Sequence, residues 1–152
     1  VHEGRKLSGY PRFNSPPEVL EAIHDTGFDI MVTANNHSMD TGKEGAENTI
    51  AQIKKNNMIP VGTGEGVKGT VADIKGIKVG VLAYTFSTNG LPAPKGYVAM
   101  TNEEEMRAGI EALRGSCDFL VVYIHAGVEY NRGVEKETER LFKLAADAGA
   151  DS

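Results

Sequence analysis

Two short polar clusters in the sequence carry side chains that could bind a metal ion and move a proton. The first reads Asn-Asn-His-Ser-Met-Asp over residues 35–40, and the second reads His-Ala-Gly-Val-Glu-Tyr over residues 125–130. Asn36 and His125 offer an amide oxygen and an imidazole nitrogen, which are donors that suit a borderline divalent ion. His37 is a candidate general acid or base because an imidazole titrates near neutral pH.

Two carboxylates accompany these residues and could orient a histidine from a second layer around the site. They are Asp40, which we group with His37 as a candidate catalytic residue, and Glu129. Each residue also has a purely structural explanation. Asn-Asn is a common turn sequence, Asp40 could simply support the next helix, whose better cap is Thr41, and a lone histidine after a strand is more often structural. The hypothesis of a site rests on these residues occurring together.

Each cluster directly follows a predicted β-strand. The apolar run within Asp29–Ala34 is continuous, which is typical of a strand that is buried on both faces in a parallel sheet. The segment Asp118–His125 has the strongest strand pattern in the sequence. Ligands of open α/β sheets bind beyond the carboxyl ends of the strands. If the two strands are parallel, both clusters lie at one edge of the sheet and can converge.

The rest of the chain predicts helices and strands in alternation. The predicted helices begin after Pro16-Pro17, after a Thr41–Glu44 capping box, at Asn102, and near the C-terminus, where Val134, Leu141, Leu144 and Ala148 form the apolar side. Further strands are expected at 59–61, 67–74 and 77–84, the last two joined by an antiparallel Lys75-Gly76 turn. The order α-β-α-β-β-β-α-β-α indicates one α/β domain over residues 1–152, with a mostly parallel sheet.

The composition excludes several classes of protein. The chain has 152 residues, 40% of them hydrophobic and 24% charged, which excludes a disordered or collagen-like chain. A net charge of −5 argues against nucleic acid as a partner, because such binding depends on phosphate neutralisation. The single cysteine, Cys117, excludes an internal disulfide and a cysteine-based zinc site. No run approaches the roughly 18 apolar residues of a membrane-spanning helix.

An anionic ligand would need a metal ion or a local basic cluster in a chain of this charge. Arg5, Lys6 and Arg12 form the only such cluster, which could face an anionic substrate or could simply be a solvated lead-in segment. The loop 62–66, Gly-Thr-Gly-Glu-Gly, has the glycines of a phosphate loop. The segment that follows it has a strand pattern rather than a helical one, so we interpret it as an ordinary flexible loop.

Several of these motifs, in this order, resemble the poly-γ-glutamate capsule synthesis (CapA-type) family. The matching segments are Tyr10–Glu18, Gly27–Asp29, Ala34–Gly42, Pro60–Gly62 and the run from His125 through Gly127 to Glu129-Tyr130. The resemblance implies a calcineurin-like metallophosphoesterase fold, a four-layer αββα sandwich with a divalent metal ion of the Mn, Fe, Zn or Mg class at the edge of a sheet. It implies that Asn36 and His125 are metal ligands and that His37 is the general acid, with Asp40 in the same signature.

The sequence also departs from the family's pattern. The family's opening Asp motif and closing His-pair motif do not occur, and Ala126 stands where many relatives carry tryptophan. We therefore expect an internal piece of a longer protein, one that binds metal weakly or not at all and is inactive by itself. The parent is expected to be a metal-dependent hydrolase of the cell envelope, membrane-anchored or extracellular. The alternative is a non-catalytic protein that handles polymer or assists assembly on the same fold.

The expected partners follow from the resemblance and from the predicted sheet. The main partner is an anionic envelope polymer, poly-γ-glutamate or a related substrate, and no nucleic acid is expected. A sheet edge left exposed by missing strands could also pair with a second copy of the chain and give a homo-oligomer.

Overall fold

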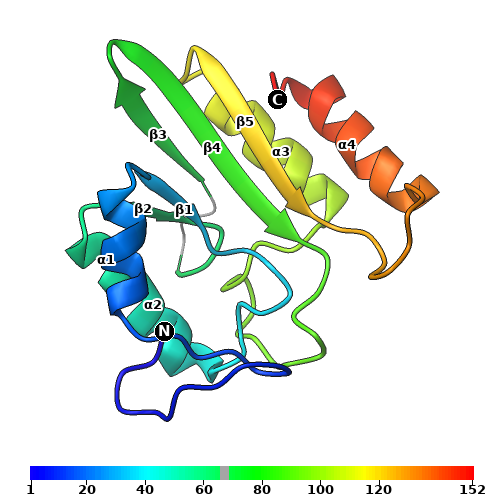
Figure 1. The fold of residues 1–152 in the computed structure, drawn as a ribbon. Helices are drawn as coiled ribbons and strands as arrows, with labels where there is room; N and C mark the ends of the chain where they lie inside the picture. The colour runs from blue at the N-terminus through cyan, green and yellow to red at the C-terminus, as the bar shows by residue number, and fades with distance from the viewer. Residues whose placement is uncertain (66–68) are drawn as a thin grey trace.

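The computed structural model describes residues 1–65 and 69–152 and shows an α/β fold (Figure 1). The elements are α1 (Glu18–Asp25), β1 (Ile30–Val32), α2 (Gly42–Lys55), β2 (Ile59–Val61), β3 (Gly69–Ile74), β4 (Ile77–Thr85), α3 (Glu103–Arg114), β5 (Phe119–His125) and α4 (Lys136–Ala148). Their order is the predicted one. Gly66, in the predicted loop, and Val67 and Lys68, the first residues of the predicted strand 67–74, lie outside the described residues.

The strands form two small sheets with mixed pairing. β1 and β2 run parallel, β3 and β4 form an antiparallel hairpin, and β5 adds to β4 in parallel. Lys75 and Gly76 both have positive φ, 55° and 88°, as the tight hairpin turn between β3 and β4 requires. The predicted α/β class with a mixed, mostly parallel sheet flanked by helices is confirmed. The four-layer αββα arrangement stays a prediction.

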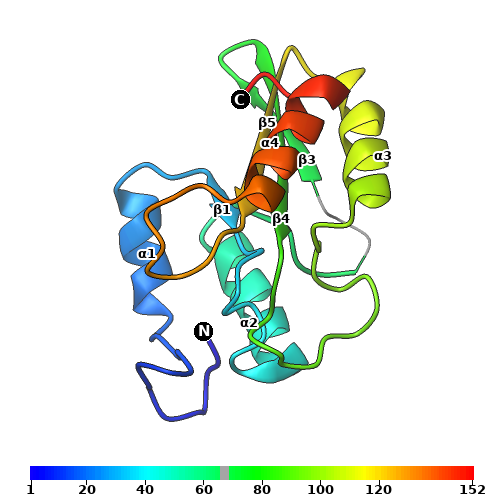
Figure 2. The same cartoon turned by 90° about the vertical axis from the view of Figure 1, so that its right-hand side faces the viewer.

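The two faces of β4 are covered by different elements. Leu82 and Tyr84 point to a core formed with α3, α4 and β5, in which Met106 and Ile110 are fully buried. Val81 and Ala83 point to the other face and pack against the β1–β2 pair. Figure 2 shows α3 and α1 on opposite sides of the central strands. β4 is therefore the strand that joins the two halves of the fold.

The segment around Ala99 forms hydrogen bonds to the carboxyl ends of both β2 and β4. The backbone N–H of Ala99 donates to the carbonyl of Gly62 (2.9 Å), and the carbonyl of Ala99 accepts from Thr85 (2.9 Å). Thr85 in turn lies opposite His125 in the register of β4 and β5. These pairings place the loops that follow β4 and β5 at one edge of the sheet.

Two details of the predicted helices are wrong. Thr41 makes no side-chain cap to α2, because its φ of −108° and ψ of 16° are not those of an extended capping residue. Val134 is not on the buried side of α4: it precedes the helix and is 75% exposed. By contrast, Asn102 caps α3 by accepting from the N–H of Glu105, and Gly149 ends α4 with a φ of 114°.

The outer edge of β5 is partly paired within the chain. Asp151 donates its backbone N–H to Leu120, and Val122 donates to the carbonyl of Ser152. The expected pairing of an exposed sheet edge with a second copy stays a prediction. Across residues 1–65 and 69–152, every helix falls short of the length and apolar content that crossing a bilayer requires.

Candidate functional site

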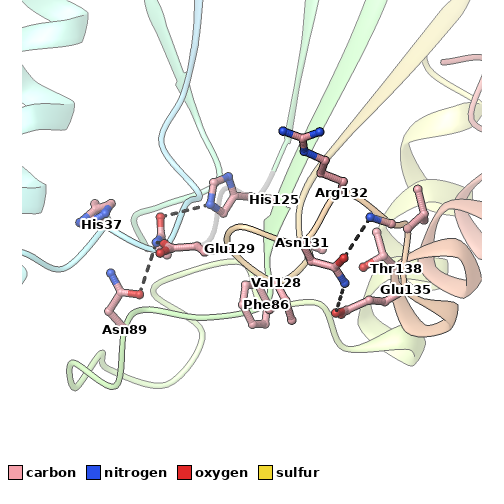
Figure 3. Close-up of a pocket in the computed structure, with 15 residues that line it drawn as sticks. His37, Phe86, Asn89, His125, Val128, Glu129, Asn131, Arg132, Glu135 and Thr138 are labelled. Atoms are coloured by element: carbon pink, nitrogen blue, oxygen red, sulfur yellow. Dashed lines mark hydrogen bonds between the residues drawn. The ribbon is translucent and has the colours of Figure 1, made fainter.

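A pocket of about 770 Å³ opens at the edge where β4 and β5 end (Figure 3). Its lining includes Asn36 and His37 from the loop after β1, Phe86 and Asn89 from the loop after β4, and His125 and Glu129 from the end of β5 and its following loop. The two clusters predicted from sequence therefore do meet. β1 and β5 belong to different sheets, and the segment around Ala99 holds the ends of those sheets together.

Asn36 and His125 contact each other directly. The Nε2–H of His125 donates to Oδ1 of Asn36 over 3.1 Å, and 89 residues of chain separate the two (Figure 3). The amide Nδ2 of Asn36 donates to Oδ1 of Asn89 (3.3 Å) and to Oε1 of Glu129 (3.5 Å). Because both of these partners accept, the amide oxygen of Asn36 is the atom that faces the imidazole.

His37 is held by Asp40 on the other side of the same loop. Its Nδ1 lies 2.8 Å from Oδ2 of Asp40, which also accepts the backbone N–H of Phe13 over 2.8 Å. The ring of Phe13 meets the imidazole edge-on, with centroids 4.7 Å apart. Asp40 is 8% exposed, so it anchors the ring from inside the protein. The carboxylate keeps the proton on Nδ1 and leaves Nε2 for a ligand.

The loop after β1 folds through its own side chains. Oδ1 of Asn35 accepts the N–H of His37 (2.8 Å), and Oγ of Ser38 accepts the N–H of Asn35 (2.9 Å) and donates to the carbonyl of Thr33 (2.7 Å). Short polar side chains form such turns readily. Asn35 therefore builds the turn, as the structural interpretation predicts, whereas Asn36 lines the pocket.

The two candidate carboxylates make different contacts in the structure. Asp40 contacts a histidine, as predicted, whereas Glu129 contacts the amide of Asn36 instead. Asn89 was missed by the sequence analysis, although it follows a strand that ends at the same edge. Its φ of 53° lies in the left-handed region that asparagine tolerates, in a short turn where its N–H donates to Oγ of Ser87.

The donors at this site fit a divalent metal ion in kind but supply only part of a ligand set. An amide oxygen and an imidazole nitrogen lie within 3.1 Å of each other, and both can bind a borderline ion. Within residues 1–65 and 69–152, no group of three or more His, Cys, Asp or Glu side chains could enclose such an ion. Catalytic ions commonly take about three protein ligands, so further donors are needed.

Comparison with known proteins gives one consistent result. Residues 1–152 match the family described as "Bacterial capsule synthesis protein PGA_cap". The chain is 30% identical over 145 residues to "Capsule biosynthesis protein CapA" of Bacillus anthracis, covering 88% of this chain and 35% of that protein. It is 29% identical over 142 residues to "PGA biosynthesis protein CapA" of Bacillus subtilis (strain 168), covering 88% and 37%. The chain thus spans little more than a third of the length of these relatives.

Proposed function

The chain belongs to the bacterial capsule synthesis protein family PGA_cap, and on that premise we propose that it carries part of the active site of a metal-dependent hydrolase of capsule polymer synthesis. The observation that carries this proposal is the convergence of Asn36 and His125 at 3.1 Å beside the His37–Asp40 pair. Asn36, His37 and His125 line one pocket at the edge of the sheet, and Asp40 lines a second depression that shares His37 with it.

The proposed role of each residue follows from which of its atoms already make hydrogen bonds. Asn36 and His125 would hold the divalent ion, which, when bound, polarises an oxygen of the substrate and activates water. His37 donates a proton to the leaving group from Nε2, because its Nδ1 is engaged by Asp40. Asp40 keeps the ring in place through its contact with Nδ1. Glu129 and Asn89 fix the orientation of the Asn36 amide.

The substrate class and location rest on the relatives. Two of them carry capsule or PGA biosynthesis in their names, so an anionic envelope polymer, poly-γ-glutamate or a related chain, is the substrate that we propose. A capsule polymer is made at the cell surface, and we therefore place the full-length protein at the envelope. Turnover assays with a phosphodiester and with poly-γ-glutamate distinguish hydrolysis of a phosphoester from hydrolysis of an amide.

Metal-dependent turnover by the full-length protein tests this function. We expect hydrolysis of a generic phosphodiester or of poly-γ-glutamate with added Mn²⁺. His37→Ala should lower kcat by about 10²–10⁴-fold, the usual contribution of a general acid. His24→Ala is the matched control, because His24 lies on α1 and contacts Asp25 (3.6 Å), outside the pocket. Full activity in His37→Ala would contradict the proposed role.

A non-catalytic polymer-handling or assembly role on the same fold is the second candidate. It is supported by the names of the two relatives, which give capsule or PGA biosynthesis and no hydrolytic activity. The same assays separate the two functions. Binding of poly-γ-glutamate without metal-dependent turnover of either substrate would support the second candidate and reject the first.

A further inference from the structure

Two adjacent depressions share His37 in their lining, and we refer to the two together as the groove. The first is the 770 Å³ pocket described above, and the second has about 280 Å³. His37, Asn89 and Glu129 line both of them. Beyond these shared residues, Arg12 lines only the second depression and Arg132 lines only the first. The candidate acid thus lines both depressions, and each depression has one arginine of its own.

The loop that carries Arg12 is fastened to the site. Ser8 and Asn14 pair through two backbone hydrogen bonds of 3.1 and 2.9 Å, and Oγ of Ser8 donates to the carbonyl of Arg12 (2.7 Å). The next residue, Phe13, donates its N–H to the same Asp40 oxygen that holds His37. The backbone beside Arg12 is therefore fixed relative to the candidate acid by a shared buried carboxylate.

The loop that carries Arg132 is held by its neighbour Asn131. The N–H of Asn131 donates to the carbonyl of Val128 (3.2 Å), and its side chain accepts from Gly133 (3.0 Å) and donates to Glu135 (3.3 Å) (Figure 3). This loop leads directly from His125 at the end of β5. A local hydrogen-bonded turn thus fixes the backbone next to Arg132, which follows the candidate metal ligand His125 by seven residues.

Both arginines keep their charge available. Among the residues that the structure describes, neither guanidinium has a hydrogen-bond or ion-pair partner, whereas Arg114 is paired with Asp151 and Arg140 with Glu137. A guanidinium binds a carboxylate with two parallel hydrogen bonds. In a chain with a net charge of −5, two arginines without a partner among residues 1–65 and 69–152 are therefore candidate binding groups for an anion. The carboxylates of Asp40, Glu129 and Glu135 also line the two depressions, so we expect an anion to bind at the arginines and not elsewhere in the groove.

We propose that a polycarboxylate chain lies along this groove, with carboxylates bound at Arg12 and at Arg132 on either side of His37. The inference rests on the proposed function for the identity of the reacting centre. A small anion would meet one arginine only, whereas a polymer reaches both. The site should therefore engage the interior of a chain and discriminate against its single repeating unit.

Binding of poly-γ-glutamate and of monomeric glutamate to the full-length protein tests this proposal. We expect Arg12→Gln and Arg132→Gln each to weaken polymer binding by about tenfold, as the loss of a charge-assisted hydrogen bond does, and to leave the much weaker binding of glutamate nearly unchanged. Arg107→Gln is the matched control, because it removes the same charge from an exposed position on α3 outside the groove.

The outcomes separate this proposal from the proposed function. Polymer affinities in the Arg12→Gln and Arg132→Gln variants equal to that of Arg107→Gln would overturn the groove, and so would a wild-type protein that does not bind the polymer. Arginine-dependent binding without any metal-dependent turnover would support the groove and reject the hydrolase. If both arginine substitutions leave metal-dependent turnover and polymer affinity unchanged, the result would support the hydrolase and reject the groove.

Discussion

Asp40→Asn is expected to lower the turnover of the full-length protein by about 100-fold or more without unfolding it. Oδ2 of Asp40 accepts from both His37 and Phe13, while Oδ1 is buried without a hydrogen-bond partner among the described residues. An asparagine amide cannot satisfy this site. If its NH₂ group replaces Oδ2, it faces two donors and forces His37 into the other tautomer. If it replaces Oδ1, the buried negative charge beside the ring is still lost.

The measurement is kcat under metal saturation, with circular dichroism as the check on folding. Asp25→Asn is a suitable control, because Asp25 lies on the surface at the end of α1 and contacts His24 instead. We expect that control to keep wild-type kcat. An Asp40→Asn protein with wild-type turnover would show that His37 does not depend on this carboxylate.

Gly62→Ala should lower the free energy of unfolding by about 2–5 kcal/mol, more than any other substitution proposed for this protein. Gly62 has a φ of 107°, a region that other residues enter only with strain. An added Cβ would lie 2.5 Å from Cβ and 2.9 Å from the backbone N of Ala34, and 3.2 Å from Cβ of Ala83. Both neighbours are fully buried and cannot move aside. Because Ala34 precedes Asn35 and Asn36, the clash should also displace the site.

Urea unfolding of Gly62→Ala beside Gly76→Ala separates the two causes of this loss. Gly76 also has a positive φ, 88°, but an added Cβ there meets nothing within 4 Å. Gly76→Ala therefore reports the backbone strain alone, expected to be about 1–2 kcal/mol. Equal losses in the two variants would mean that the close contact with Ala34 contributes nothing.

The elements of this fold were predictable where the signal is local. The continuous apolar runs located β1 and β5, and the Lys75-Gly76 turn identified the β3–β4 hairpin. The predicted cap at Thr41 and the predicted burial of Val134 were wrong, because backbone conformation and exposure at these positions depend on loops that the pattern of residue types does not define. The division into two sheets was not predicted, because strand pairing between distant segments is a property of the tertiary structure.

The site could be predicted only in part. The rule that ligands bind at the carboxyl ends of strands located Asn36, His37 and His125. Applied to β4, the same rule would have pointed to the loop that holds Asn89. The contact of Asn89 with Asn36 spans 53 residues, and no motif signals it. The place of Arg12 beside His37 depends likewise on a folded loop and not on any spacing in the sequence.

Titration of the metal-stripped full-length protein with Mn²⁺ tests the central claim most directly, that Asn36 and His125 are metal ligands. Loss of residues that merely support a ligand costs about 10–100-fold in metal affinity. We therefore predict that His125→Ala weakens Mn²⁺ binding at least tenfold, in line with the lower bound of that range, while His24→Ala binds as the wild type does. Mn²⁺ affinity that is the same in His125→Ala, His24→Ala and the wild type would contradict this claim.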